Sequence, residues 1–289
     1  MKLVLSTCAK IAPVEHLHTA ETHLGHAMGS PPLSSTVIGR WALLGWAAAN
    51  STNSVALAAI RQAPLHALDH VALFVDHQRA GRGQQQRIWT QEPGRDLAMT
   101  AVVSKSLPEK HPFVLNLAVS LAVIEAIEEA LPTVSRSGLE IKWPNDIMWR
   151  GRKAGGILIE NNWRGNAWSS AVIGIGLNLA GHPPFPNAAR LLPETEADAA
   201  PFLDELRQSI LPRIDHRMAE MRHPEALLRQ YHQRLHGWGQ AQRWQLDGQT
   251  ISGTLESIDI EGRLCVATEG VQHCFSPGEV GWLGMEPRK

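Results

Sequence analysis

The sequence predicts an α+β protein in which strands and helices alternate, followed by a small all-β domain. Three observations lead to this prediction. A hairpin pattern broken by a proline covers residues 139–160, and an apolar helical pattern covers residues 112–131. Short strands separated by Asp-Gly and Glu-Gly turns follow Gly239, and such turns are typical of β-hairpins.

The length and composition indicate an ordinary soluble globular protein. A chain of 289 residues with 44% hydrophobic residues allows one large or two modest domains. We expect a lead-in segment over residues 1–36, a main domain over 37–237 and the β domain over 238–289. A net charge of −1 gives no general reason to bind nucleic acid or a membrane, so we expect neither as a partner.

Cysteine usage indicates a reducing compartment. Cys8, Cys265 and Cys274 form no CxxC pair, and the longest early apolar run, residues 41–49, is too short to span a bilayer. The N-terminus lacks the apolar region of a signal peptide, so we expect a cytoplasmic protein. Cys265 and Cys274 can face each other across a hairpin that turns at Glu269-Gly270, and we expect this pair to be reduced.

The lead-in segment has weak periodicity and four histidines between His16 and His26. Their spacing matches no zinc-binding pattern, so we expect no metal site there. The segment is also too short for a helix-turn-helix domain.

Local patterns predict the elements in order. Strands are expected at residues 37–49, 71–75, 97–104 and 168–177, at both ends of the 139–160 hairpin, and at 243–246, 250–258, 264–268 and 271–276. Helices are expected at 54–62, 112–131, 199–223 with an interruption at Pro212, and 224–236. Loops are expected at 76–89 and 181–200.

The 139–160 hairpin contains the largest group of charged and polar residues suited to binding a ligand. Its turns hold Lys142, Asn145, Asp146 and Lys153 near one end of the sheet. Two cations, an amide and a carboxylate beside the glycines of Gly155-Gly156 suit a polyanion and its metal ion. The alternative is a basic surface hairpin with an ordinary proline bulge.

Further polar groups gather where other strands end. Ser51, Thr52 and Asn53 precede the 54–62 helix, where capping alone explains them, although a helix N-terminus also offers donors to a ligand. Arg82 and Arg87 lie in the Gly- and Arg-rich 76–89 loop and are suited to phosphate, unless the loop is only a flexible, solvated connection. Asn178 ends a strand, a position that a turn residue also explains.

These motifs together resemble those of biotin–protein ligases. The matching stretches, in order, are Ser51-Thr52-Asn53, the loop residues Gln78, Gly81, Arg82, Gly83, Arg87 and Trp89, KWPND at 142–146 followed by K-x-G-G-I-L-x-E at 153–160, GIGxN at 174–178, and G-x-L-x-x-I-D-x-x-G-x-L with F-x-x-G-E-V at 253–280. The resemblance covers residues 40–283. It implies a mixed, mostly antiparallel sheet flanked by helices, as in class II synthetases and biotin ligases, with a small SH3-like β-barrel at the C-terminus.

The resemblance also implies an activity. Biotin–protein ligases activate biotin with ATP to biotinyl-5′-AMP and pyrophosphate, then transfer biotin to a lysine of a biotin carboxyl carrier protein. The implied cofactors are ATP, biotin and Mg²⁺, and the implied assembly is a monomer or a homodimer. The short lead-in segment favours the form of the family without a DNA-binding domain, so a repressor role is disfavoured.

The resemblance assigns site residues by their place in the motifs. Lys153 and Arg82 are the implied catalytic residues. The implied biotin-binding residues are Ser51, Thr52, Asn53, Gln78, Arg82, Gly83, Gln84 and Lys153, and the implied ATP-binding residues are Arg87, Trp89, Lys142, Asn145, Asp146 and Asn178. No fixed metal ligand is implied: Mg²⁺ would arrive with ATP, with Asp146 as one candidate contact. We expect Lys142, more than Lys153, to be held in a structural ion pair.

Two loop residues depart from the family pattern. Gln84 stands where the family usually has a second arginine, and Gln86 stands where it has a glycine. A neutral amide in place of a charge-assisted donor leads us to expect that biotinyl-AMP is held less tightly. A lipoate–protein ligase and a non-catalytic biotin-binding paralogue remain as alternatives.

Overall fold

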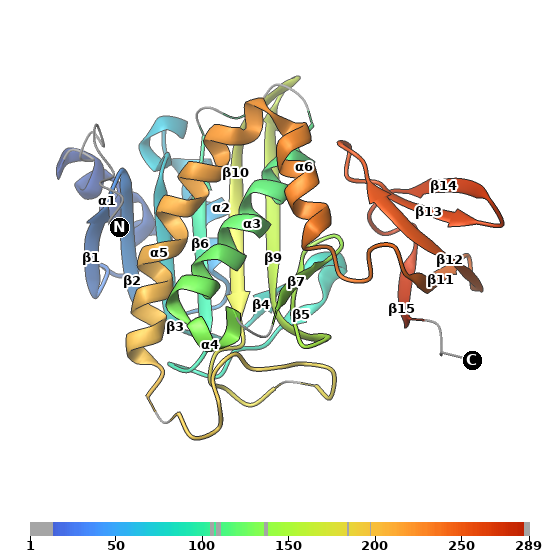
Figure 1. Ribbon diagram of the computed structural model, residues 1–289. Coiled ribbons are helices and arrows are strands. Elements are labelled where there is room, and N and C mark those ends of the chain that lie inside the picture. Colours follow the sequence, from blue (N-terminus) through green and yellow to red (C-terminus); the bar gives the residue numbers. More distant parts are fainter. Residues whose placement is uncertain are drawn as a thin grey trace, which may run out of the picture.

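An eight-stranded sheet forms the centre of the main domain (Figure 1). The computed structural model describes residues 14–104, 107, 111–135, 138–183, 185–196 and 198–285. Adjacent strands are antiparallel except β2 and β3, which are parallel. The predicted mixed, mostly antiparallel sheet is therefore confirmed. In sheet order the strands are β1 (Ser34–Ile38), β2 (Trp41–Ala49), β3 (Val71–Gln78), β6 (Leu97–Val103), β10 (Ala167–Leu177), β9 (Arg152–Arg164), β8 (Asp146–Trp149) and β7 (Leu139–Lys142).

Helices cover both faces of this sheet (Figure 1). One face carries α3 (Phe113–Ala130), α5 (Ala200–Ala219) and α6 (Pro224–Gln233), and the other carries α1 (Val14–Met28) and α2 (Thr52–Gln62). Helix α3 is apolar around most of its circumference because it lies between the sheet and the outer helices. Two hydrophobic cores result, one on each face. Short helical segments complete the domain: η1 (Leu65–Leu68), η2 (Gln84–Gln86), α4 (Pro132–Ser135) and η3 (Glu220–Arg222).

Three predicted elements differ from the structure. Helix α1 lies inside the segment expected as an irregular lead-in. The single strand predicted over 37–49 is a hairpin of β1 and β2, which turns at Gly39 with a φ of +58°. Helix α5 continues through Pro212, so the predicted interruption is wrong. Packing of Ile210, Leu211 and Ile214 in the core outweighs the backbone hydrogen bond that proline removes.

The C-terminal domain is a five-stranded antiparallel sheet in the order β14-β13-β12-β11-β15. Its predicted hairpins at Asp247-Gly248 and Glu269-Gly270 are confirmed, and both residues of each turn have positive φ. The edge strands β14 and β15 share no ladder among the described residues, and β15 was not predicted. The strands are β11 (Ala241–Leu246), β12 (Gln249–Ile258), β13 (Leu264–Thr268), β14 (Val271–Phe275) and β15 (Gly281–Met285).

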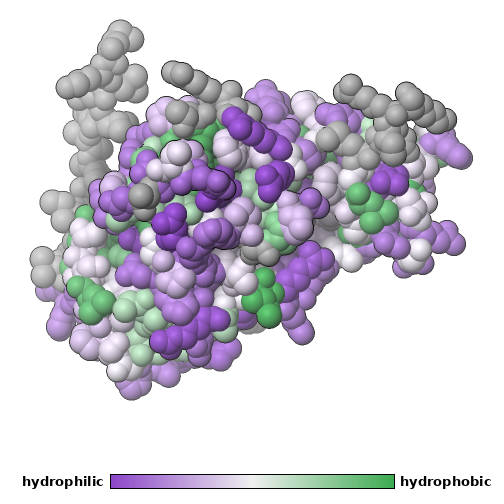
Figure 2. Space-filling view, turned by 90° about the horizontal axis from the view of Figure 1, so that it is seen from below, coloured by the Kyte–Doolittle hydropathy of each residue, from purple (hydrophilic) through white to green (hydrophobic). Residues whose placement is uncertain are grey.

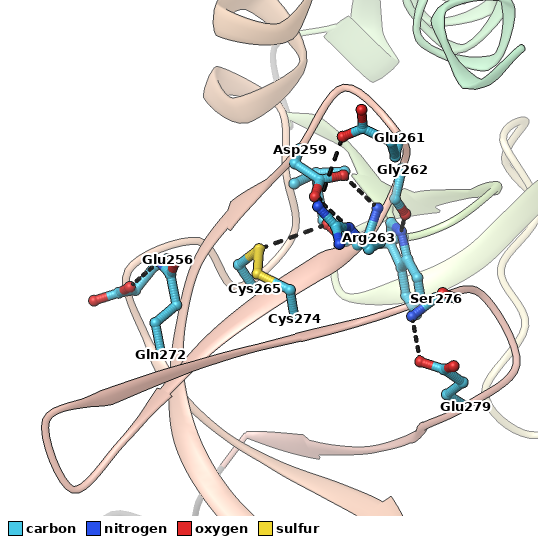
Figure 3. Close-up of a disulfide and its surroundings, with 12 residues drawn as sticks. Glu256, Asp259, Glu261, Gly262, Arg263, Cys265, Gln272, Cys274, Ser276 and Glu279 are labelled. Atoms are coloured by element: carbon cyan, nitrogen blue, oxygen red, sulfur yellow. Dashed lines mark hydrogen bonds and ion pairs between the residues drawn. A yellow bond between two sulfur atoms is a disulfide. The ribbon is translucent and has the colours of Figure 1, made fainter. Parts of the chain in front are cut away.

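A disulfide joins Cys265 and Cys274 across this sheet (Figure 3). The two residues are direct partners in the β13–β14 register, as expected, with Cα atoms 4.1 Å apart. The expectation that they are reduced is wrong for this structure. It rested on the number and spacing of cysteines in the chain, whereas the hairpin register brings the two thiols into bonding range.

The connection between the domains adds a short strand-like segment to β7. The amide of Ile141 donates to the carbonyl of Arg234 at 2.7 Å, and the amide of His236 donates to the carbonyl of Ile141 at 2.8 Å. Trp143 Nε1 also donates to the carbonyl of Gly262 at 2.9 Å. These bonds fix the C-terminal domain beside the turn that joins β7 and β8. Within the described part of the chain, no helix is both long and apolar enough to cross a membrane.

Candidate functional site

A cleft of about 750 Å³ opens between the main sheet and the C-terminal domain. The end of the molecule seen in Figure 2 is mainly hydrophilic, and its apolar side chains form small separate spots. The cleft brings together every residue that the sequence placed at the site except Asn178. The predicted residues that line it are Ser51, Thr52, Asn53, Gln78, Arg82, Gly83, Gln84, Arg87, Trp89, Lys142, Asn145, Asp146 and Lys153.

A buried hydrogen-bond network forms the part of the cleft beside the start of α2. Thr52 donates to Gln78 Oε1 from its backbone amide at 2.9 Å and from its hydroxyl at 3.2 Å. The hydroxyl of Thr100 lies 2.7 Å from both the Thr52 hydroxyl and Asn53 Oδ1. Ser51 caps α2, and its side chain accepts from a backbone amide of the first turn. The network orients these polar groups before any ligand arrives.

Sequence reasoning gave no role to two members of this network. Thr100 is fully buried and is the one polar residue of β6. Glu160 accepts from Asn53 Nδ2 at 2.9 Å and from Arg82 Nη2 at 2.6 Å. A single carboxylate thus ties the 76–89 loop to β9 and to the start of α2.

Glycines of β10 leave space for two of the cleft side chains. A Cβ at Gly174 would lie 2.4 Å from Asn53 Oδ1, and a Cβ at Gly176 would lie 2.4 Å from the Trp89 ring. Neither position could hold a larger residue without moving its neighbour. The indole of Trp89 therefore packs against the backbone of β10, with its ring centroid 5.7 Å from Lys153 Nζ.

The two lysines of the cleft have different partners. Lys153 Nζ forms an ion pair with Asp146 Oδ1 at 2.6 Å. Lys142 Nζ instead lies 4.1 Å from the ring centroid of Trp282, a residue of β15. The expectation that Lys142 is the one in an ion pair is therefore wrong. Asp146 is the register partner of Lys142 in the β7–β8 ladder, but its carboxylate pairs with Lys153 of the next strand, β9. Burial lowers the pKa of Lys142 below the ordinary lysine value.

The two predicted asparagines hold backbone together. Asn145 Nδ2 donates to the carbonyl of Ile157, and the amide of Ile157 donates back to the carbonyl of Asn145 at 2.9 Å, so the β7–β8 turn is fastened to β9. Asn178 is buried and does not line the cleft, and its Nδ2 donates to the carbonyl of Ala189 at 3.2 Å. Its contact with ATP stays a prediction.

Comparison with known proteins identifies the family. A family model described as biotin/lipoate A/B protein ligase matches residues 46–178. A biotin–[acetyl-CoA-carboxylase] ligase of Mycobacterium tuberculosis is 32% identical over 235 residues, which cover 80% of this chain and 85% of that protein. The chain belongs to the biotin–protein ligase family.

Other relatives agree with this assignment. A bifunctional ligase/repressor of Bacillus subtilis is 33% identical over 129 residues, which cover 44% of this ligase and 38% of that protein. The structure of a biotin protein ligase from Aquifex aeolicus in complex with biotin and ATP has a TM-score of 0.67 and 22% identity, and the match covers 84% of this ligase and 98% of that chain. That likeness supports the fold. The family and the fold class predicted from the sequence are both confirmed.

The loop over the cleft of this ligase has an unusual backbone. Gln85 and Gln86 have φ values of +52° and +61°, in a region of backbone conformation that residues other than glycine rarely adopt. Gln86 is the residue that replaces the glycine usual in the family. The loop is exposed over residues 84–88, and in the structure it is tied to the sheet through the ion pair of Arg82 and Glu160.

The C-terminal domain of the ligase also lines the cleft, which sequence reasoning did not predict. Gly278 and residues 280–284 form this wall, and Trp282 faces Lys142. The F-x-x-G-E-V motif was read only as a domain signature, because a sequence gives no register between two domains.

Proposed function

We propose that this ATP-dependent ligase uses the cleft for both of its steps: biotin and ATP give biotinyl-5′-AMP and pyrophosphate, and a carrier lysine then takes the biotinyl group. The observation that carries the proposal is the meeting, in one cleft, of a preorganised polar network and two ammonium groups. The network suits the neutral, hydrogen-bonding part of biotin, and the cations suit the phosphates.

The first step has a simple physical purpose. A free carboxylate does not acylate an amine at neutral pH, because oxide is a poor leaving group. A carboxylate oxygen of biotin attacks the α-phosphorus of ATP, and the bond from that phosphorus to the bridging oxygen of pyrophosphate breaks. We assign Lys153 and Arg82 to the negative charge that builds up there.

Ligand contacts follow from position in the cleft. We assign biotin to the network around the start of α2 and to the loop, and ATP to the β7–β8 turn and its surroundings. The biotin contacts are Ser51, Thr52, Asn53, Gln78, Arg82, Gly83, Gln84 and Lys153. The ATP contacts in the cleft are Arg87, Trp89, Lys142, Asn145 and Asp146. Asn178 does not line the cleft, and we propose it as an ATP contact from its place in the family motif alone.

Mg²⁺ fits this site as a companion of ATP. Among the described residues that line the cleft, Asp146 is the one with a carboxylate, and it already pairs with Lys153. Mg²⁺ commonly binds through one or two carboxylates together with substrate phosphates. Asp146 is the residue that would hold it, and the ion would supply positive charge to the phosphates.

In the second step a carrier lysine attacks the acyl carbon of biotinyl-AMP, AMP leaves, and the amine loses a proton. The relative from Mycobacterium tuberculosis is named for acetyl-CoA carboxylase, so we propose a biotin carboxyl carrier domain as the partner. The net charge of −1 gives no general reason to bind nucleic acid or a membrane surface, so we propose neither as a partner. We propose a cytoplasmic monomer or homodimer.

Mass spectrometry tests the proposed partner. Purified ligase with biotin, ATP and Mg²⁺ should convert an unmodified carrier domain to its biotinylated form. The same domain with its acceptor lysine changed to arginine is the matched control and should stay unmodified. An unmodified wild-type carrier, in a reaction that does form biotinyl-AMP, would contradict the carrier assignment.

A further inference from the structure

Trp282 brings an aromatic face of the C-terminal domain to a cation of the main domain. The side chain is half-buried, lines the cleft and lies with its ring centroid 4.1 Å from Lys142 Nζ. An ammonium group above an indole ring is attracted by the negative face of the ring. This contact crosses the domain boundary inside the cleft.

Lys142 keeps its charge available to a ligand. Lys153 has a carboxylate at 2.6 Å, whereas among the described residues no carboxylate lies within ion-pair distance of Lys142. The charged groups that face Lys142 are Asp146, Lys153 and Arg87. The indole ring holds the ammonium in place without neutralising it, so the full charge can meet a polyphosphate.

The Trp282 ring is itself held firmly. Its Nε1 donates to Gln242 Oε1 at 3.0 Å, and Gln242 is fully buried. The edge of the ring meets His236, with ring centroids 5.4 Å apart and planes at 72°. His236 Nδ1 lies 2.7 Å from Glu140 Oε2, and Glu140 precedes Lys142 by two residues on β7. A closed circuit of contacts therefore runs from β7 through His236 and Trp282 back to Lys142.

We propose that Trp282 is a positioning residue for adenylation, which acts by holding the ammonium of Lys142 toward the phosphates of ATP. The C-terminal domain then takes part in the first half-reaction. The proposal rests on the proposed function of the cleft. Trp282 makes and breaks no bond in it.

A double-mutant cycle tests the proposal. The variants are Trp282→Ala, Lys142→Met and the pair together, and biotin-dependent pyrophosphate–ATP exchange gives the KM for ATP and kcat of each. We expect Trp282→Ala to raise the KM for ATP about tenfold and to leave the biotin Kd, from calorimetry, within about twofold. In the Lys142→Met background the same change should add nothing. Trp282→Phe keeps a ring and should recover most of the loss.

Trp238→Ala is the matched control. Trp238 belongs to the connection between the domains, is 46% exposed and does not line the cleft. Its loss should leave the KM for ATP unchanged. If Trp282 mattered only for domain packing, Trp282→Ala and Trp238→Ala would change the KM for ATP to the same extent.

Several results would overturn the proposal. The first is an unchanged KM for ATP in Trp282→Ala. The second is an equal rise in the KM for ATP when Trp282→Ala is added to Lys142→Met. The third is a loss of biotin affinity in Trp282→Ala as large as the rise in the KM for ATP. If the wild type catalysed no exchange, the proposed function would fail instead. ATP calorimetry on the biotin-saturated protein would then decide the role of Trp282: weaker binding in Trp282→Ala supports it, and unchanged binding overturns it.

Discussion

Lys142 of β7 and Lys153 of β9 enter one cleft from either side of β8, yet of the two only Lys153 has a carboxylate partner. We expect Lys153→Ala to lower the rate of biotinyl-AMP formation by about 100- to 1000-fold, because positive charge at the reacting phosphate is lost. Single-turnover formation of biotinyl-AMP measures this rate. Arg164→Ala, at the exposed far end of the same strand, is the control and should behave as wild type. An unchanged rate in Lys153→Ala would remove Lys153 from its assigned role.

The loop residue Gln84 leads to a prediction about the intermediate. An arginine there would supply a charge-assisted donor to the bound anhydride, so we expect Gln84→Arg to slow the release of biotinyl-AMP several-fold. Gel filtration followed by assay of the free intermediate measures release. Gln86→Gly, which relieves only a positive φ, is the comparison variant and should change the release rate less. Complete retention of the intermediate by the wild type over many turnovers would contradict the idea that it leaks.

Sequence motifs predicted most of the individual residues that line the cleft, but not the residues that hold them in place. Ser51, Asn53 and Lys153 each stood in a recognisable string. Thr100 stood alone in an apolar strand, and that single polar residue was its only signal. Its role depends on the antiparallel pairing of β3 with β6, a long-range register that no local pattern contains.

Among the elements, the β1–β2 hairpin is joined to α5 by a cluster of charges remote from the cleft. Arg40, in the hairpin turn, donates to Asp215 of α5 at 2.9 and 3.0 Å. His70 Nδ1 lies 2.9 Å from Asp69, and its Nε2 lies 3.5 Å from Asp215. Burial by itself would lower the pKa of His70, but the carboxylates of Asp215 and Asp69 outweigh it, and the pKa is raised.

This cluster should make stability depend on pH. A raised pKa in the folded state means that protonated His70 stabilises the fold below the ordinary value of 6.5, and that this contribution is lost as pH rises through the folded pKa. We therefore expect the free energy of unfolding to fall as pH rises above 6.5. Urea titrations of the wild type and of His70→Asn, which tolerates the φ of +56°, measure it. Equal pH profiles for the two proteins would exclude His70 as the cause.

Element boundaries were predicted best where the pattern was long. Helix α3 was predicted within one or two residues because apolar residues recur at helical spacing along its whole length. Helix α1 was missed because histidines fill much of its surface and hide the spacing of Leu17, Leu24 and Met28. The β1–β2 turn was missed because the predicted strand over residues 37–49 runs straight through Gly39, although a glycine that can adopt a positive φ is a turn signal.

The whole molecule is a ligase domain whose cleft is completed by a second, smaller domain. The order of the two parts could be predicted, since strands and hairpin turns after residue 239 differ in pattern from what precedes them. The contacts between the two parts could not be predicted. Trp143 with Gly262 and Lys142 with Trp282 join residues more than a hundred positions apart, and their pairing follows from packing alone.

Biotin-dependent exchange of labelled pyrophosphate into ATP is the most direct test of the central claim that this cleft adenylates biotin. The purified protein would be assayed with Mg²⁺ and biotin, with lipoate as the parallel acid, because the matching family model includes both kinds of ligase. We predict exchange with biotin and none with lipoate. Exchange with lipoate alone would move the assignment to the lipoate ligases. No exchange with either acid, in a folded protein that still binds biotin, would contradict the claim.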